Sequence, residues 1–204
     1  MKNSKFFKAV ILVVTAAVGA LLWLKFLDAL DPEVDENDGE GEQEIDPDLA
    51  SAQPGDVLLF NRAKGLNRLI TWFTKSRFYH VGIYVGDNHV VEARPRGVVT
   101  RDLMGPDGDK RFEIIPAEKV GGHEIASRAC DWAKSQIGDG YDPVNVAAIV
   151  LDRTFTCCVL NTSLPDRWAC GEFVAAAFEQ AGHELFPEKE AARVVPADFE
   201  KFLS

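Results

Sequence analysis

Short apolar runs bounded by turn residues recur through the middle of the chain and predict strands. Residues 56–60 (DVLLF) follow a Pro-Gly pair, and residues 111–115 form another short run. Residues 81–85 (VGIYV) and 89–93 (HVVEA) contain β-branched side chains and are separated by Gly-Asp-Asn at 86–88. This spacing predicts a β-hairpin with a three-residue loop.

Other segments carry apolar residues at helical spacing. Residues 171–180 (GEFVAAAFEQ) are rich in alanine and are followed closely by Gly182, a typical helix stop. The same periodicity predicts helices over residues 65–73, 125–137 and 144–151. Strands clustered early, with helices on either side, predict an α+β domain built on a small antiparallel sheet packed against helices.

The first 27 residues have a different pattern, with four lysines, no acid and an uncharged apolar run over residues 9–24. Sixteen helical residues rise roughly 24 Å, and the flanking Phe and Leu residues lengthen the span to that of a bilayer core. We expect a retained membrane helix over residues 1–27, in a single-pass protein with an exported C-terminal domain. A signal segment that is cleaved to give a secreted domain is the alternative.

A short acidic segment follows the apolar run. Residues 28–48 carry eleven acids and no base, so they repel one another and cannot bury an apolar face. We therefore expect an extended, disordered linker over residues 28–52. Residues 53–204 then form the folded domain, which is long enough for one core.

Charge refines this picture. The 204-residue chain has 22 Lys and Arg against 32 Asp and Glu, and a hydrophobic fraction of 47% that excludes wholesale disorder. An acidic chain argues against a nucleic-acid partner, because binding there depends on Lys and Arg that neutralise phosphates. Most of the acidic excess belongs to the linker, however, so the domain itself is close to neutral.

Basic residues gather around the predicted hairpin. Residues 61–101 hold eight Lys and Arg against two acids, which favours an anionic peptide, glycopeptide or lipid substrate, or the membrane surface. A solvated charged face is an equally weighted alternative. The eight are Arg62, Lys64, Arg68, Lys75, Arg77, Arg94, Arg96 and Arg101.

Cys170 is the cysteine whose context favours chemistry. It stands where an irregular segment gives way to the alanine-rich helix. Free N–H groups at a helix N-terminus favour a thiolate and can stabilise an oxyanion. A buried structural cysteine is the alternative there. The other cysteines have simpler interpretations: Cys130 is expected to pack in the core, and Cys157 and Cys158 to pack or to form a disulfide. The chain has no CxxC motif, which argues against a zinc ribbon or a thioredoxin-like site.

Cysteine catalysis needs a base, and His80 is the best candidate because it opens an apolar strand. Glu92 lies within the next apolar strand. With a three-residue loop the two share one face of the sheet, whereas a two-residue loop would place them on opposite faces. A carboxylate on the same face would orient the imidazole and stabilise its charge. The remaining histidines, at 89, 123 and 183, fall at turns and helix ends and suit solvation.

The order of these residues resembles the permuted NlpC-type papain-like amidases. The resemblance rests on the histidine of YHVGIYVGD, Glu92 twelve residues later, and the cysteine of WACGEFVAAAFEQAG. Residues 53–60, 140–142 (GYD) and 195–199 (VPADF) support it. It implies a circularly permuted papain-like fold, with Cys170 as nucleophile, His80 as general base and Glu92 as the orienting residue. A glutamate at this position, rather than a histidine or an asparagine, resembles the bacterial and poxviral branch of the family more than the lecithin-retinol acyltransferase branch.

One position departs from the family pattern. The family often has serine where this chain has Gly171, so contacts made by that hydroxyl do not carry over.

The resemblance, with the predicted anchor, implies a membrane-tethered cysteine hydrolase that cleaves an amide, an ester or a thioester through an acyl-enzyme, without a cofactor. A cell-wall peptide or a related acyl substrate fits the charge pattern. A non-catalytic or acyltransferase-like module that binds lipid or the cell envelope is the alternative. A metal site at His80, Glu92 and Cys170 is disfavoured, because no fourth ligand stands at a recognisable spacing.

Overall fold

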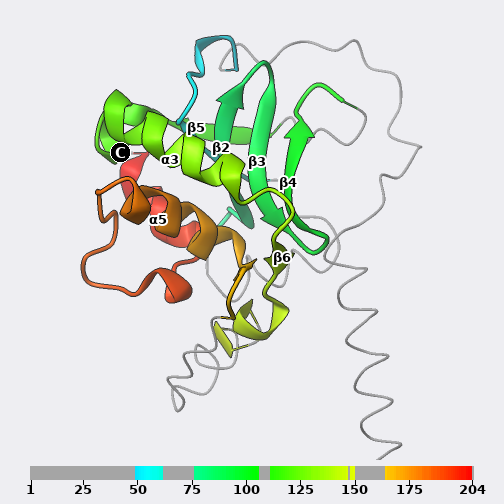
Figure 1. Cartoon of the computed structure of the whole chain (residues 1–204). Helices are drawn as coiled ribbons and strands as arrows, with labels where there is room; N and C mark the ends of the chain where they lie inside the picture. Colours follow the sequence, from blue (N-terminus) through cyan, green and yellow to red (C-terminus); the bar gives the residue numbers. More distant parts are fainter. Residues whose placement is uncertain (1–48, 62–75, 106–110, 147, 150–163, 204) are drawn as a thin grey trace, which may run out of the picture.

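A five-stranded antiparallel sheet, in the order β4-β3-β2-β1-β5, organises the domain (Figure 1). The computed structural model describes residues 49–61, 76–105, 111–146, 148–149 and 164–203. The strands are β1 (Val57–Phe60), β2 (His80–Gly86), β3 (His89–Arg94), β4 (Gly97–Asp102) and β5 (Phe112–Ile115). The expected α+β class and small antiparallel sheet are confirmed.

Strand β4 was not predicted from the sequence. Its letters, GVVTRD, contain two adjacent apolar residues and no alternation that continues to its end. The later buried position on β4 is Arg101, whose charge hides the periodicity of a half-buried strand. The other four strands lie where the apolar runs predict them.

Two helices cover one face of the sheet (Figure 1). Helix α3 (His123–Ser135) buries four small residues at 126, 129, 130 and 133, which is the spacing of a single helical stripe. Helix α5 (Cys170–Gln180) buries most of its length, and the chain leaves it through Gly182, whose φ of +88° suits glycine. Both helices confirm the sequence periodicity.

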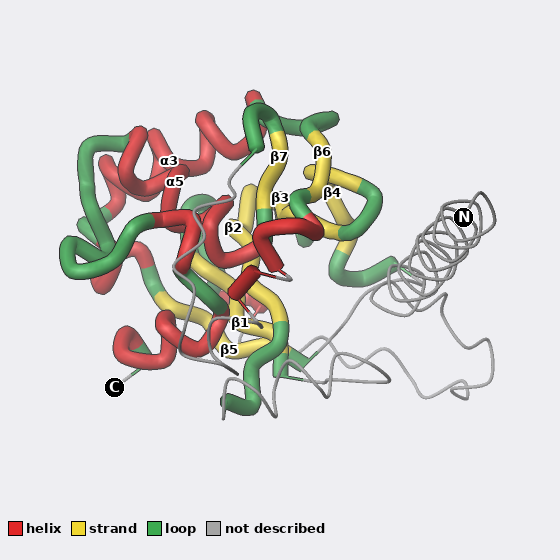
Figure 2. Tube along the Cα trace, turned by 90° about the horizontal axis from the view of Figure 1, so that it is seen from below, coloured by secondary structure: helices red, strands yellow, loops and turns green. Residues whose placement is uncertain are grey.

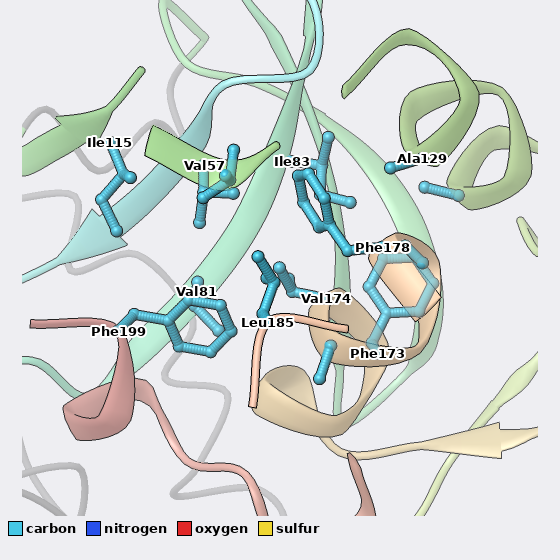
Figure 3. Packing of buried hydrophobic residues seen from close by; sticks show 14 of the residues in the cluster. Val57, Val81, Ile83, Ile115, Ala129, Phe173, Val174, Phe178, Leu185 and Phe199 are labelled. Atoms are coloured by element: carbon cyan, nitrogen blue, oxygen red, sulfur yellow. The ribbon is translucent and has the colours of Figure 1, made fainter. Parts of the chain in front are cut away.

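The main core fills the space between these helices and the sheet (Figure 3). Small residues on α3 allow close approach, and larger side chains on α5 fill the centre. The cluster includes Val57, Val81, Ile83, Ile115, Ala129, Phe173, Val174, Phe178, Leu185 and Phe199.

The opposite face of the sheet has a second, smaller apolar cluster. Leu58 and Phe60 of β1 point to this face, as do Tyr84 of β2 and Val90 of β3. Leu49, from the short helical turn η1 (Leu49–Ser51), is buried against the same cluster. The central strands are therefore apolar on both sides, which explains their continuous apolar runs.

Short elements complete the domain. Strands β6 (Gly140–Tyr141) and β7 (Arg167–Trp168) form a parallel pair that lies beside β4 and leads into α5 (Figure 2). Besides η1, the described residues include the 3₁₀ helices η2 (Ala117–Val120), η3 (Ala191–Arg193) and η4 (Pro196–Phe202), of which η2 and η4 contribute buried side chains. Residues 143–146 and 148–149 are helical and overlap the segment 144–151 for which a helix was expected.

Several expectations lie outside the described residues. They are the membrane helix over residues 1–27, nearly all of the acidic linker and the helix over residues 65–73. In the part of the chain that the structure describes, no helix combines the length and hydropathy needed to cross a bilayer.

The hairpin between β2 and β3 differs in detail from its prediction. The turn consists of Asp87 and Asn88, both with positive φ (51° and 61°), instead of three residues. A register shift between Tyr84 and Gly86 inserts one further residue into β2. The irregularity and the two-residue turn together equal the predicted three-residue loop in length. His80 on β2 and Glu92 on β3 therefore lie on the same face of the sheet, as a three-residue loop predicts.

Replacing Phe199 on η4 tests whether the C-terminal segment belongs to the main core. Phe199 is fully buried and meets the ring of Phe186 edge-on at 5.0 Å, whereas Phe202 on the same element is partly buried. We expect Phe199→Ala to lower the free energy of unfolding by about 3–5 kcal/mol in urea denaturation. Phe202→Ala should cost clearly less, and equal losses would contradict this packing.

Candidate active site

His80 begins β2 directly opposite Phe60 of β1. Its ring lies 5.6 Å from that of Phe60 and 6.0 Å from that of Tyr79, and 15% of its side chain is exposed. The imidazole therefore sits between aromatic rings at the edge of the second cluster, with one side open.

Glu92 reaches His80 diagonally across the hairpin. Ile83 pairs with Val91 and Tyr84 with Val90, so Glu92 stands opposite Gly82 and shares a face with His80. The Nε2 atom of His80 lies 2.9 Å from Oε2 of Glu92. The prediction that both side chains lie on one face is confirmed.

Gly82 provides the space for this diagonal contact. A Cβ atom there would lie 2.7 Å from Cγ2 of Val90 and 3.1 Å from Cβ of Glu92. A larger residue would thus displace the glutamate that stands opposite. The glycine in this apolar run therefore leaves the room that Glu92 and Val90 occupy on β3.

Arg101 of β4 binds the same carboxylate. Its Nε donates to Oε1 of Glu92 at 2.5 Å, and its Nη2 donates to Oε2 at 3.0 Å. Nη1 of Arg94 lies 3.5 Å from Oε1. Glu92 is fully buried and Arg101 is 8% exposed, so the pair is enclosed within the protein. Arg101 was counted among the basic residues available to an anionic substrate or to solvent, and its burial against Glu92 excludes it from both groups.

These contacts shift two pKa values in opposite directions. Burial lowers the pKa of His80, but the charge of Glu92 and hydrogen bonds to Cys170 and Glu92 outweigh it and raise the pKa to about 9. Burial raises the pKa of Glu92, but His80 and Arg101 hold it well below its usual range. The imidazole is thus protonated, and the carboxylate charged, at neutral pH.

Both shifts make folding stability depend on pH. The pKa of His80 rises on folding from 6.5, so its contribution is complete below that pH and is lost as the pH rises through about 9. The pKa of Glu92 falls from 4.5, so its contribution is complete above that pH and is lost in stronger acid. The pair stabilises the domain most between these ordinary pKa values.

Cys170 begins helix α5 as a free, partly exposed thiol. Cys170 lies close to His80, because a side-chain interaction with the thiol and its charge are both among the causes that raise the pKa of the imidazole. The preceding residue, Ala169, has no side-chain oxygen with which to cap the helix, so its side chain does not compete for the first N–H groups. The three residues singled out from the sequence therefore form one chain of contacts, Cys170–His80–Glu92.

A buried polar network supports the start of α5. Oε2 of Glu172 accepts the N–H of Ala169 at 3.3 Å and Nδ2 of Asn145 at 2.9 Å. Asn145 also donates to the carbonyl of Ala192 at 2.8 Å, and its N–H donates to Asp142. The network holds three segments together next to Cys170. Asp142 belongs to the GYD motif found in the sequence, but no sequence pattern linked this residue to Asn145 and Glu172.

Tyr141, beside Asp142, lies close to the thiol. Burial raises the pKa of Tyr141, and the charges of Cys170 and Asp142 raise it further. The phenol therefore stays protonated and remains a hydrogen-bond donor. Tyr141 belongs to the GYD motif of residues 140–142, but the sequence alone indicated no role for its phenol.

Gly171 has a steric explanation. A Cβ atom there would collide with the carbonyl oxygen of Val194 and would lie 2.9 Å from Cα of Val195. The backbone before η4 packs directly on the helix at this point. The departure from serine at this position is thus matched by a close backbone approach that serine would not permit.

The remaining candidates lie in other surroundings. His89 bonds to the carbonyl of Asp87 at the hairpin turn, and His123 forms an exposed pair with Glu118. Cys130 is buried in α3, as expected. Cys157, Cys158, Arg62, Lys64, Arg68 and Lys75 lie outside the described residues. Within the described ranges, no group of three or more His, Cys, Asp or Glu side chains could hold a metal ion.

Comparison with known proteins supports a relationship to peptidases. The chain is similar to the probable lipoprotein peptidase YaeF of Escherichia coli (strain K12), at 28% identity over 179 residues. The aligned region covers 74% of this chain and 63% of the relative, so the chain spans less than two thirds of that protein's length. No family model matches the chain.

Replacing Gly82 tests how the imidazole and carboxylate are brought together. We expect Gly82→Ala to displace Glu92 and to lower the pKa of His80 from about 9 toward 6.5, measured by NMR titration of the ring. Gly105→Ala is the control, because a Cβ there makes ordinary contacts with Asp102. An unchanged His80 titration in Gly82→Ala would contradict the proposed steric role.

Proposed function

We propose that this domain is a cysteine hydrolase of the permuted papain-like type, which cleaves an amide through a thiol acyl-enzyme. The observation that carries the proposal is the chain of contacts from Cys170 through His80 to a fully buried Glu92. The chain order His, Glu, Cys and the similarity to a probable lipoprotein peptidase support it.

The first half-reaction forms the acyl-enzyme. A protonated imidazole beside a thiol favours the thiolate, which is the nucleophilic form. Sγ of Cys170 attacks the substrate carbonyl carbon, and the N–H groups at the start of α5 stabilise the oxyanion. His80 then gives its proton to the leaving amine as the C–N bond breaks, leaving a thioester on Cys170.

The second half-reaction releases the acid. Neutral His80 removes a proton from a water molecule, which attacks the thioester carbonyl and expels the thiolate of Cys170. The proton then resides on the imidazole, so the starting state is restored. Throughout, Glu92 accepts the N–H of Nε2 and stabilises the positive charge, because its carboxylate has no contact with solvent.

The substrate we propose is an anionic peptide, glycopeptide or lipid of the cell envelope, with a cell-wall peptide as the leading candidate. The basic composition of residues 61–101, even without the buried Arg101, and the name of the similar lipoprotein peptidase support this class. The apolar N-terminal run supports attachment to the membrane, with the domain exported.

Thiol labelling tests whether the proposed nucleophile is activated. We expect iodoacetamide to label Cys170 at least tenfold faster than Cys130, because Cys170 is partly exposed beside His80, whereas Cys130 is buried in α3 and burial raises the pKa of its thiol. His80→Ala should remove this selectivity. Labelling at each site is measured by mass spectrometry of peptides.

The structural control is Cys130→Ala, which should leave labelling of Cys170 unchanged. Equal rates at the two thiols, or rates indifferent to His80→Ala, would contradict the catalytic proposal. Selective labelling without an acyl-enzyme on peptidoglycan fragments or phospholipids would instead overturn the proposed substrates and favour a binding module.

The pH dependence of kcat/KM tests the role of His80. Because the leaving group takes a proton from the imidazolium, we expect activity to fall as the pH rises through about 9. Glu92→Gln removes the charge that most strongly raises this pKa, so the alkaline limit should move down by about one to three pH units. An alkaline limit that stays near 9 in Glu92→Gln would refute this assignment.

A further inference from the structure

Arg101 occupies an unusual position for an arginine, because its side chain is buried on β4 beside the proposed active site. Thr100 pairs with Val91, and Val99 pairs with Glu92, so Arg101 lies diagonally across from the glutamate on β3. Its guanidinium also stacks over the ring of Phe60 at 4.9 Å. The arginine is thus fixed at two points, a carboxylate and an aromatic face.

The contact with Glu92 fixes the plane of the carboxylate. One nitrogen of Arg101 binds Oε1 and another binds Oε2, which is the paired geometry that a guanidinium imposes on a carboxylate. Oε2 is also the atom that lies 2.9 Å from His80. A carboxylate held in this way cannot rotate without breaking a bond to Arg101, so its orientation toward the imidazole is set from β4.

Arg101 also opposes the effect of Glu92 on the imidazole. An isolated buried carboxylate would bind the proton of His80 very tightly, because charges attract strongly where water is absent. A positive guanidinium on the same carboxylate reduces that attraction. Among the described residues, Arg94 on β3, Cys170 on α5 and the ring of Tyr79 also face the pair, and Tyr141 lies near the thiol.

We propose that Arg101 is a positioning residue, which fixes Glu92 for its bond to His80 and limits how tightly the imidazole holds its proton. The reaction step that depends on this limit is proton transfer from His80 to the leaving group. This inference rests on the proposed function for its catalytic consequence, but its effect on the histidine can be measured without any substrate.

The first experiment measures His80 itself. In a Cys170→Ala background, which removes the thiol from the titration, we expect Arg101→Met to raise the pKa of His80 by about one unit in NMR titration. Glu92→Gln should lower the His80 pKa in the same background, so the two substitutions have effects of opposite sign. An unchanged or lowered His80 pKa in Arg101→Met would overturn the proposal, whatever the catalytic activity.

The second experiment uses the active enzyme and the conservative variant. Arg101→Lys keeps the charge but cannot form the paired contact, so kcat should fall by up to about a hundredfold with the pH profile little changed. Arg128→Met is the matched control, since Arg128 forms an exposed pair with Glu124 on α3, and it should leave both kcat and profile unchanged. Wild-type kcat in Arg101→Lys would overturn the positioning role.

A double-substitution cycle tests whether Arg101 acts through Glu92. If it does, Glu92→Gln combined with Arg101→Met should lose no more activity than Glu92→Gln alone. A greater loss would show that Arg101 contacts the substrate directly and would overturn the proposal. Arg101→Lys keeps a positive charge beside Glu92, so it gives a second test if Arg101→Met does not fold. Absence of hydrolysis with a shifted His80 titration would refute the proposed function alone.

Discussion

The buried negative charge of Glu92 is the constraint on which the rest of the site depends. An uncompensated carboxylate with no contact with solvent is strongly destabilising, so its partners must be supplied by the fold. His80 comes from β2, Arg101 comes from β4, and Gly82 leaves the space that Glu92 occupies opposite it. The correct pairing of three neighbouring strands is therefore enforced by one side chain, and the same arrangement produces a charged imidazole.

Periodicity in the sequence predicted most of the described fold because apolar residues dominate the buried positions. Four strands and the helices α3 and α5 lie where their patterns indicate. Strand β4 was missed because its later inward residue is charged, and a charge at a buried position is invisible to a hydrophobic pattern. The burial of Arg101 was missed for the same reason. Glu92 was identified from the pattern of β3 alone, and that pattern does not indicate an arginine partner on β4.

The candidate residues were found by a different kind of signal, a polar side chain within an apolar run or at the start of a helix. That signal identified His80, Glu92 and Cys170, which the structure brings into contact. It did not single out the supports of α5, because Asn145 and Glu172 each stand near the start of a predicted helix, where an asparagine or a glutamate is ordinary. Their role follows from long-range contacts between segments, which a single sequence does not encode locally.

The register shift at Gly86 has a consequence for how the hairpin can change in length. Gain or loss of one residue between Tyr84 and His89 would turn His80 and Glu92 to opposite faces, while gain or loss of two would preserve their contact. Insertions and deletions compatible with this site should therefore occur in even numbers, or in odd numbers together with a compensating bulge. The positive φ values at Gly86, Asp87 and Asn88 restrict which residues the loop accepts, and parity restricts how many it can contain.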